Sequence, residues 1–399
     1  MKRIVVIGGG IGGAEAAISL SREFRKKEGY QIDLISDKED LFIYPLSIWI
    51  PVGKRTPMDI SMPLGAIAKQ RKFNFIHEKV ARIVSKENKV ITDKGEHSYD
   101  YLVIAIGADK LRPKGIEHTL SICGGPVEAV KIRERFFELV AKGSGTIACG
   151  FSGNPKDSTG VRGGPVFEVL FNIDTSLREK GIRQNFKLIF FSPSQEAGKR
   201  LGGPGLKALQ TLFTERHVEP IFGKKISEFN ADGILFEGDE QLQTDLTIFT
   251  PGMQGHPVFK NSDLPLTEAG FIFINDFCQA KPADENCHLN HIDNCYVIGD
   301  SSSFDGPEWR AKQGHLAEAM ARVVAKNIAL KESGKPQTET FSQHLNILCV
   351  MDLGNEAAFI YRDDKRAISP IGTWAHWAKV AWEKYYKLNK KGKLPNAPL

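Results

Sequence analysis

The feature that most constrains the fold is a glycine-rich turn close to the start of the chain. The apolar run Ile4–Ile7 leads directly into Gly8–Gly13, which has the pattern G-x-G-x-x-G. Apolar residues then recur at helical spacing from Ala14 to about Lys26, and a second apolar run occupies Gln31–Ser36. A strand, a glycine turn, a helix and a second strand within about 30 residues are typical of a dinucleotide-binding unit.

The turn and the end of the second run carry the residues expected to hold that dinucleotide. Gly8, Gly10 and Gly13 permit the tight turn, the close approach of a pyrophosphate and the packing of the helix on the strand. Free N–H groups at the helix start favour an anion there. Asp37 is the candidate partner of the ribose hydroxyls, and Ser36 stands where an acidic residue is more usual. No arginine stands beside Asp37 to hold a 2′-phosphate, which disfavours NADP.

A second unit of the same kind follows in the middle of the chain. Gly145–Cys149 reads as a strand, residues 150–164 as a glycine-rich loop, Pro165 to about Lys180 as a helix and Phe186–Phe191 as another strand. Two such units predict an α/β fold with two Rossmann-like dinucleotide-binding domains.

Two later segments favour FAD over NAD as the first dinucleotide. The segments Tyr101–Gly107 and Cys295–Asp300 resemble the second and third fingerprints of flavoproteins that have two dinucleotide-binding domains. In that class the aspartate binds the ribityl chain, and the helix that follows stabilises negative charge on the flavin. The residues expected against FAD in this later part of the chain are therefore Gly107, Gly299, Asp300 and Lys312.

The last part of the chain is rich in aromatic residues and lysines and predicts a helix that lies on a membrane surface. One helical face carries Trp374, Trp377, Ala381, Tyr385 and Leu388. The lysines elsewhere on this helix, expected to reach the headgroups, are Lys379, Lys384, Lys387, Lys390 and Lys391. A docking helix or a dimer contact is the alternative interpretation.

These segments divide the chain into four parts. Residues 1–111 and 251–335 form the FAD-binding domain, 112–250 the second Rossmann-like domain, and 336–399 a C-terminal region that binds membrane and quinone.

Composition excludes several other classes. With 399 residues and a net charge of +5, the chain is globular and too weakly basic for a dedicated nucleic-acid binder. Six cysteines are too few for a disulfide scaffold of this length. The spacing Cys287-His288-x-x-His291-x-x-x-Cys295 matches no zinc module, so no metal is expected. Neither a signal peptide nor an apolar run of about 18 residues is present, which predicts a location on the cytoplasmic side.

Over nearly its whole length the chain resembles the sulfide:quinone oxidoreductase family, with flavocytochrome c sulfide dehydrogenase and type II NADH dehydrogenases as relatives. The resemblance includes Leu34–Asp37, Trp49–Gly53, Ser121–Cys123, Gly164–Glu168 and Gln254–Gly255. Its most specific parts are Cys349–Gly354 and Trp374–Trp377.

The resemblance implies an enzyme in which sulfide reduces FAD and a membrane quinone reoxidises it. It implies that Cys349 is the redox cysteine near the flavin, that Cys123 is a further cysteine of the sulfur chemistry, and that Glu168 relays protons. Leu348 and Trp382 are the implied contacts of the quinone ring. Self-association into a homo-oligomer is left open.

One departure from the family pattern is the loop at residues 151–163, which lacks the partner cysteine that family members carry there. Three alternatives follow: an external sulfur acceptor serves a single cysteine, another cysteine pairs with Cys349, or the substrate differs. Lys156 and Arg162 of this loop are candidates for holding an anionic sulfur species. Two competing functions are NADH:quinone oxidoreduction and electron transfer to a partner haem protein. The same loop disfavours the first, because it offers no clean second G-x-G-x-x-G.

Overall fold

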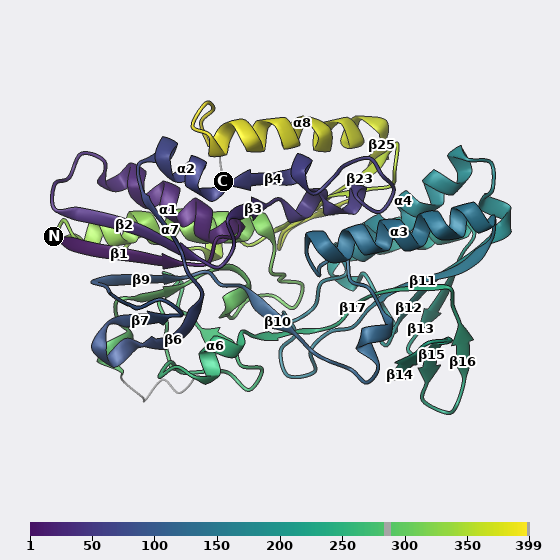
Figure 1. The fold of residues 1–399 in the computed structure, drawn as a ribbon, viewed down its shortest axis with the longest axis horizontal. Helices are drawn as coiled ribbons and strands as arrows, with labels where there is room; N and C mark the ends of the chain where they lie inside the picture. The colour runs from purple at the N-terminus through teal and green to yellow at the C-terminus, as the bar shows by residue number, and fades with distance from the viewer. Residues whose placement is uncertain (283–288, 397–399) are drawn as a thin grey trace.

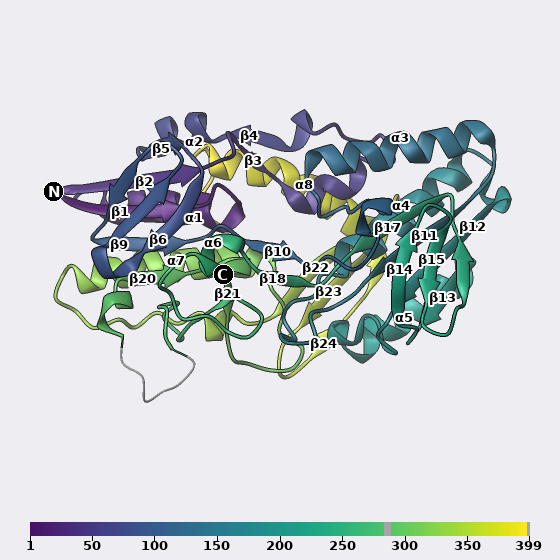
Figure 2. The same ribbon diagram turned by 60° about the horizontal axis from the view of Figure 1, so that its bottom comes forward.

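The computed structural model describes residues 1–282 and 289–396 of the chain. Two parallel sheets lie at opposite ends of an elongated molecule (Figures 1 and 2). The chain passes from the first sheet to the second through β10 (Ala108–Lys110) and returns through β18 (Met253–Gly255), and these two short strands pair with each other. The four-part division expected from the sequence stays a prediction.

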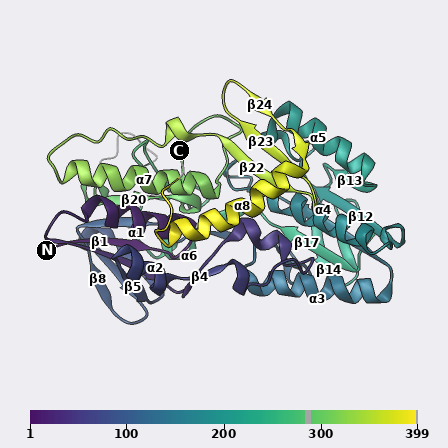
Figure 3. The ribbon, with the colours of Figure 1, turned by 90° about the horizontal axis from the view of Figure 1, so that it is seen from above.

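The first sheet contains the N-terminal strand at its centre, buried from Ile4 to Ile7. Its five strands are parallel, with the order β20-β9-β1-β2-β5. Across the sheet they are β20 (Cys295–Val297), β9 (Tyr101–Ile104), β1 (Lys2–Ile7), β2 (Tyr30–Ser36) and β5 (Asn74–His77). Helices α1 (Ile11–Phe24) and α7 (Gly314–Lys331) run side by side against it (Figure 3). The strand–turn–helix–strand unit predicted at the start of the chain is confirmed.

The second sheet confirms the second predicted Rossmann-like unit. Its parallel order is β13-β12-β11-β17, and phenylalanine rings fill the layer between the sheet and its helices. The strands are β11 (Gly145–Phe151), β12 (Phe186–Ser192), β13 (Val218–Phe222) and β17 (Leu246–Thr250). The helices of this half are α3 (Pro126–Lys142), α4 (Gly164–Glu179) and α5 (Gly202–Glu215).

Smaller elements complete both halves. The first half also has β3 (Asp40–Phe42), β4 (Ser61–Pro63), α2 (Leu64–Arg71), β6 (Val80–Val84), β7 (Lys89–Thr92), β8 (Glu96–Ser98), α6 (Pro257–Lys260), β19 (Ile272–Phe273) and β21 (Ser302–Ser303). The second half adds the antiparallel strands β14 (Ile226–Asn230), β15 (Gly233–Phe236) and β16 (Gln241–Gln243).

The C-terminal region is an antiparallel ribbon followed by a long helix. The ribbon consists of β22 (Ile347–Asp352), β23 (Ala357–Arg362), β24 (Ala367–Ile368) and β25 (Ile371–Gly372). Helix α8 (Thr373–Lys390) then lies along one face of the molecule and reaches from the second half to the first (Figures 1 and 3). Among the helices of the described residues, none is long and apolar enough to cross a membrane.

The prediction that all lysines of this helix are solvated is wrong for two of them. Lys379 and Lys390 are buried, because each faces carboxylates of the body of the protein. The expected aromatic face is present on the outside, where Trp374 and Trp377 are exposed. Buried ion pairs therefore help to seat α8, together with its inward-facing apolar residues Ala375 and Tyr386, while its two exposed tryptophans point outward.

Candidate active site

The first glycine turn has the shape that a dinucleotide pyrophosphate requires. Gly8 has φ +103°, and a Cβ there would lie 2.3 Å from the carbonyl oxygen of Ala105. A Cβ on Gly13 would lie 1.8 Å from the carbonyl oxygen of Gly8. Gly10 faces open space and precedes α1, whose first turn has no side-chain cap and no acidic residue. The free N–H groups of this turn fit a diphosphate.

Ser36, the last residue of β2, and Asp37, which follows it, have different surroundings. Ser36 is buried, and its hydroxyl both accepts from the backbone N–H of Lys38 (3.0 Å) and donates to the carbonyl of Lys38 (3.1 Å). The Asp37 carboxylate is exposed and lies 3.1 Å from the Lys38 ammonium. Ser36 thus shapes the turn, and Asp37 is the group free to meet ribose hydroxyls.

The flavin end of the cradle is built where β9 and β20 end. Gly107 and Gly299 both have positive φ, +79° and +63°. The Ser301 hydroxyl bridges both backbone groups of Gly107, accepting at 2.9 Å and donating at 3.0 Å. The carboxylate of Asp300 forms an ion pair with the guanidinium of Arg162. Arg162, a sulfur-anion candidate in the sequence, therefore pairs with a predicted cofactor residue.

Lys312 and Gln313 add polar groups at the start of α7. Lys312 is only 5% exposed, its ammonium lies 3.1 Å from the centre of the Phe271 ring, and burial lowers its pKa to about 7. The Gln313 side-chain oxygen is buried and has no hydrogen-bond partner among the described residues. The polar edge of a flavin ring at this helix start would give both side chains a hydrogen-bond partner, so the residues present fit FAD.

Cys349 lies in the middle of β22, opposite Ile360 of β23, and is half-buried. Burial, together with the negative charge of Glu168, raises the pKa of its thiol to about 12, and the Lys379 ammonium opposes that rise. The resting side chain is thus a thiol, and its use as a nucleophile needs a proton acceptor.

A buried polar network beside Cys349 supplies such groups. Glu168 accepts from the backbone N–H of Asp352 (2.8 Å) and is ion-paired with Lys379. The Lys379 ammonium also donates to the carbonyl of Val350 (3.0 Å). Asp352 in turn accepts from Nδ1 of His376, at 2.6 Å. Burial raises the pKa of Glu168, although Lys379 opposes it.

Sequence reasoning missed Lys379, Asp352 and His376 as members of this site. The helical pattern placed Lys379 on the polar side of α8, and only its contact with α4 shows that the charge is internal. The stretches containing Asp352 and His376 carried the family resemblance, which was the available signal.

Cys123 has different surroundings from Cys349. Burial raises the pKa of its thiol, and the nearby cations Arg162 and Lys110 oppose that effect. Within the described residues all five cysteines, Cys123, Cys149, Cys278, Cys295 and Cys349, are free thiols. Cys149 is fully buried in β11, in agreement with a core role.

Cys287 and His288 lie outside the described residues. Among the residues that the structure describes, no metal-ligating cluster occurs.

Side chains of this protein fill the space beside the loop between β11 and α4. A Cβ on Gly163 would lie 2.5 Å from the ring of Phe151, so this ring covers the first turn of α4. Asn154 and Thr159 are buried in the loop, which is held by the bond from the Asn154 amide to the carbonyl of Met253 (2.8 Å). Lys156 is at the surface and pairs with Glu268.

The two predicted quinone contacts lie in different settings. Leu348 is exposed on β22, directly before Cys349. Trp382 is half-buried on α8, with its ring 4.9 Å from that of Tyr386. Both assignments stay predictions.

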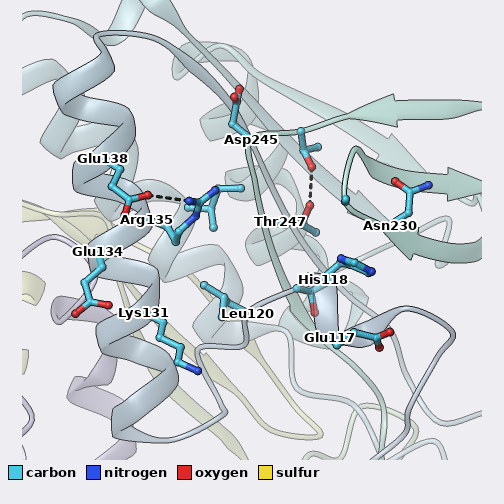
Figure 4. Close-up of a pocket in the computed structure, with 14 residues that line it drawn as sticks. Glu117, His118, Leu120, Lys131, Glu134, Arg135, Glu138, Asn230, Asp245 and Thr247 are labelled. Atoms are coloured by element: carbon cyan, nitrogen blue, oxygen red, sulfur yellow. Dashed lines mark hydrogen bonds and ion pairs between the residues drawn. The ribbon is translucent and has the colours of Figure 1, made fainter.

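A separate polar pocket of about 310 Å³ lies between α3 and the start of β17 (Figure 4). Arg135 and Glu138 form an ion pair on its wall. Ligands of open parallel sheets bind at the carboxyl ends of the strands, whereas this pocket is at the amino end of β17. It contains none of the predicted site residues.

Comparison with known proteins agrees with this geometry. The model of the pyridine nucleotide-disulphide oxidoreductase family matches residues 2–321. Sulfide-quinone reductase of Aquifex aeolicus is 28% identical, over 96% of this chain and 90% of the relative. A type II NADH:quinone oxidoreductase of Staphylococcus aureus is 23% identical, over 93% of this chain and 96% of the relative.

Among solved structures, the sulfide:quinone oxidoreductase of Aquifex aeolicus superposes with a TM-score of 0.85 at 26% identity, covering 98% of this chain and 92% of that one. The match to the family model extends over both parallel sheets, the first glycine turn and the second and third flavin fingerprints. FAD is the cofactor that the cradle takes. The chain therefore belongs to the pyridine nucleotide-disulphide oxidoreductase family.

Proposed function

We propose that this chain is an FAD-dependent sulfide:quinone oxidoreductase that works at a membrane surface. The observation that carries the proposal is the position of Cys349 beside the buried Glu168–Lys379 ion pair. The relatives named sulfide-quinone reductase, which align over nearly the whole chain, support the same substrate.

The chain's own residues can prepare the sulfur nucleophile. Glu168 accepts the proton of the Cys349 thiol, and Lys379 stabilises the thiolate that results. Asp352 ties this pair to α8, because its backbone N–H donates to Glu168 (2.8 Å) and its carboxylate contacts Nδ1 of His376 (2.6 Å). Bound FAD supplies the two-electron carrier between sulfide and quinone.

Oxidation of NADH is the less favoured activity because of Phe151. Its ring covers the start of α4, where a second dinucleotide pyrophosphate would have to bind. The next strand, β12, ends in Ser192 and not in an acidic residue, and the Ser192 hydroxyl donates to the carbonyl of Phe151 (3.1 Å). The position after this strand therefore offers no free acid to a cofactor ribose.

The outer face of α8 supports binding to a membrane. Trp374 and Trp377 are 53% and 65% exposed. The neighbouring ribbon adds Leu348, Ile368 and Ile371 as further exposed apolar residues. Exposed aromatic residues on an amphipathic helix are typical of interfacial binding. The cytoplasmic side is the expected side, and quinone would reach the flavin from the lipid.

Sulfide-dependent reduction of a short-chain quinone by the purified holoenzyme tests the proposal. The wild type should turn over, and Cys349→Ser should lose at least about 100-fold in rate while keeping its FAD, as expected for loss of a nucleophile. Cys149→Ala is the matched control, because the Cys149 thiol is buried in β11 of the second parallel sheet and not in the ribbon of Cys349. Equal rates in Cys349→Ser and wild type would overturn the role of Cys349.

A further inference from the structure

The loop between β11 and α4, which has no cysteine, turns one of its two cations inward. Lys156 is at the surface and pairs with Glu268, whereas the Arg162 guanidinium is ion-paired with the Asp300 carboxylate. The side chains of the inner pair are 27% and 24% exposed. Arg162 and Asp300 are 138 positions apart, so this pair joins the loop of the second half to the third flavin fingerprint.

The main chain that carries this guanidinium is held in place by bonds on two sides. The Asn154 amide donates to the carbonyl of Met253 (2.8 Å), and the backbone N–H of Met253 donates to the carbonyl of Gly160 (2.9 Å). The hydroxyl of Ser303, in β21, donates to Asp157 of the loop (2.9 Å). The loop is thus fixed against the segment of the inner carboxylate, and the ion pair forms at little cost in loop entropy.

Both members of the pair keep polar groups available. In the described part of the chain, Arg162 is the one side chain that hydrogen-bonds the Asp300 carboxylate, and it does so through Nη2. Nε and Nη1 of Arg162 and the Oδ1 atom of Asp300 make no hydrogen bond there, and none of these atoms is fully buried. Asp300 can therefore accept from a ribityl hydroxyl while it remains paired with Arg162.

The pairing also changes the charge that the flavin meets. Reduction places negative charge on the flavin, and a carboxylate close by would oppose it by Coulomb repulsion. The guanidinium of Arg162 offsets the charge of Asp300. Because a guanidinium does not lose its proton in proteins, this compensation persists over the whole working range of pH.

We propose that Arg162 is a positioning residue of the flavin site, which aims Asp300 at the ribityl chain and, by offsetting its charge, raises the reduction potential of bound FAD. The inference rests on the assignment of Asp300 to FAD and goes beyond the proposed function, because it does not depend on the substrate that reduces the flavin. It gives Arg162 a role at the cofactor instead of at a sulfur anion.

A redox titration of the holoenzyme without sulfide tests this role. Protein freed of unbound FAD is reduced slowly with xanthine and xanthine oxidase beside a reference dye. At the same dye ratio, Arg162→Gln should show a ratio of reduced to oxidised flavin at least about tenfold below that of the wild type, or about 30 mV for a two-electron couple. Arg162→Lys keeps the charge and should lie closer to the wild type.

Lys156→Gln is the matched control, because it removes one positive charge from the same loop at the surface. Its flavin ratio should equal that of the wild type. Equal ratios in Arg162→Gln and the wild type would overturn the proposal, and so would a shift of the same size in Lys156→Gln.

Substitution of the carboxylate tests whether charge compensation is the cause. Asp300→Asn should shift the flavin ratio in the opposite direction, because it leaves the cation without its anion. The double variant Arg162→Gln/Asp300→Asn should return to within about threefold of the wild type and should retain FAD, since Asn keeps a carbonyl acceptor. A double variant displaced as far as Arg162→Gln, or one that loses FAD, would overturn the proposal.

The outcomes separate this role from the proposed function. Flavin that sulfide does not bleach, in protein whose dye titration shows the expected shifts, would refute sulfide oxidation and leave the role of Arg162 intact. Bleaching by sulfide, with the same potential in Arg162→Gln and the wild type, would refute only the role of Arg162.

Discussion

The Lys379 ammonium of α8 is ion-paired with the Glu168 carboxylate of α4, and both side chains are only 6% exposed. This contact joins the surface helix to a helix of the second half, next to the strand of Cys349, because Lys379 also donates to the carbonyl of Val350. Asp352 and His376 extend this link, because Asp352 donates its backbone N–H to Glu168 and its carboxylate contacts His376 of α8.

Lys379→Met should destabilise the protein, because it leaves the buried Glu168 without its counter-charge. Loss of one partner of a buried ion pair costs about 3–5 kcal/mol in unfolding free energy. Denaturant unfolding of the holoenzyme measures this cost. The double variant Glu168→Gln/Lys379→Met should regain most of the stability but not the sulfide-dependent rate. A single variant as stable as the wild type would contradict the pairing.

Lys312 predicts a specific dependence of stability on pH in the FAD-free protein. Its pKa is about 7 in the fold and about 10.4 in an unfolded chain, so between these values only the unfolded state holds the proton. This group therefore makes stability rise with pH from 7 toward 10, with a slope of at most about 1.4 kcal/mol per pH unit. Lys312→Met should remove that slope. An unchanged slope in the variant would show that other groups cause it.

Lys390 should hold the end of α8 on the FAD-binding half. It is 1% exposed and ion-paired with Glu15 of α1 and Glu318 of α7, and Arg71 donates to its backbone carbonyl. Lys390→Met should lower the melting temperature and expose the C-terminal segment to limited proteolysis, since Glu15 loses a buried counter-charge. The exposed neighbour Lys391→Met should behave like the wild type. Equal digestion of the two variants would contradict the anchoring role.

The outer face of α8 predicts lipid binding. Trp374→Ser/Trp377→Ser should reduce sedimentation with anionic phospholipid vesicles at least about tenfold, because two exposed aromatic side chains leave the interface. Turnover with a water-soluble quinone should persist, which separates lipid binding from catalysis. Vesicle binding that is unaffected by the double substitution would place the membrane contact elsewhere.

Local patterns predicted most of the fold but only part of the site. The turn at Gly8–Gly13 and the strands around it could be recognised because their chemistry is contained in consecutive residues. The ion pairs of Lys379 with Glu168 and of Lys390 with Glu15 join residues more than 200 positions apart, so the helical pattern of α8 alone could not predict them. The pairing of Arg162 with Asp300 was hidden for the same reason.

Anaerobic titration of the holoenzyme tests the central claim most directly. Sulfide and NADH are added separately while the oxidised-flavin absorbance near roughly 450 nm is followed, a band characteristic of this cofactor class. The account predicts bleaching by sulfide, recovery on addition of a soluble quinone, and no rapid bleaching by NADH. Bleaching by NADH and not by sulfide would contradict it, and would show that Phe151 does not close the second dinucleotide site.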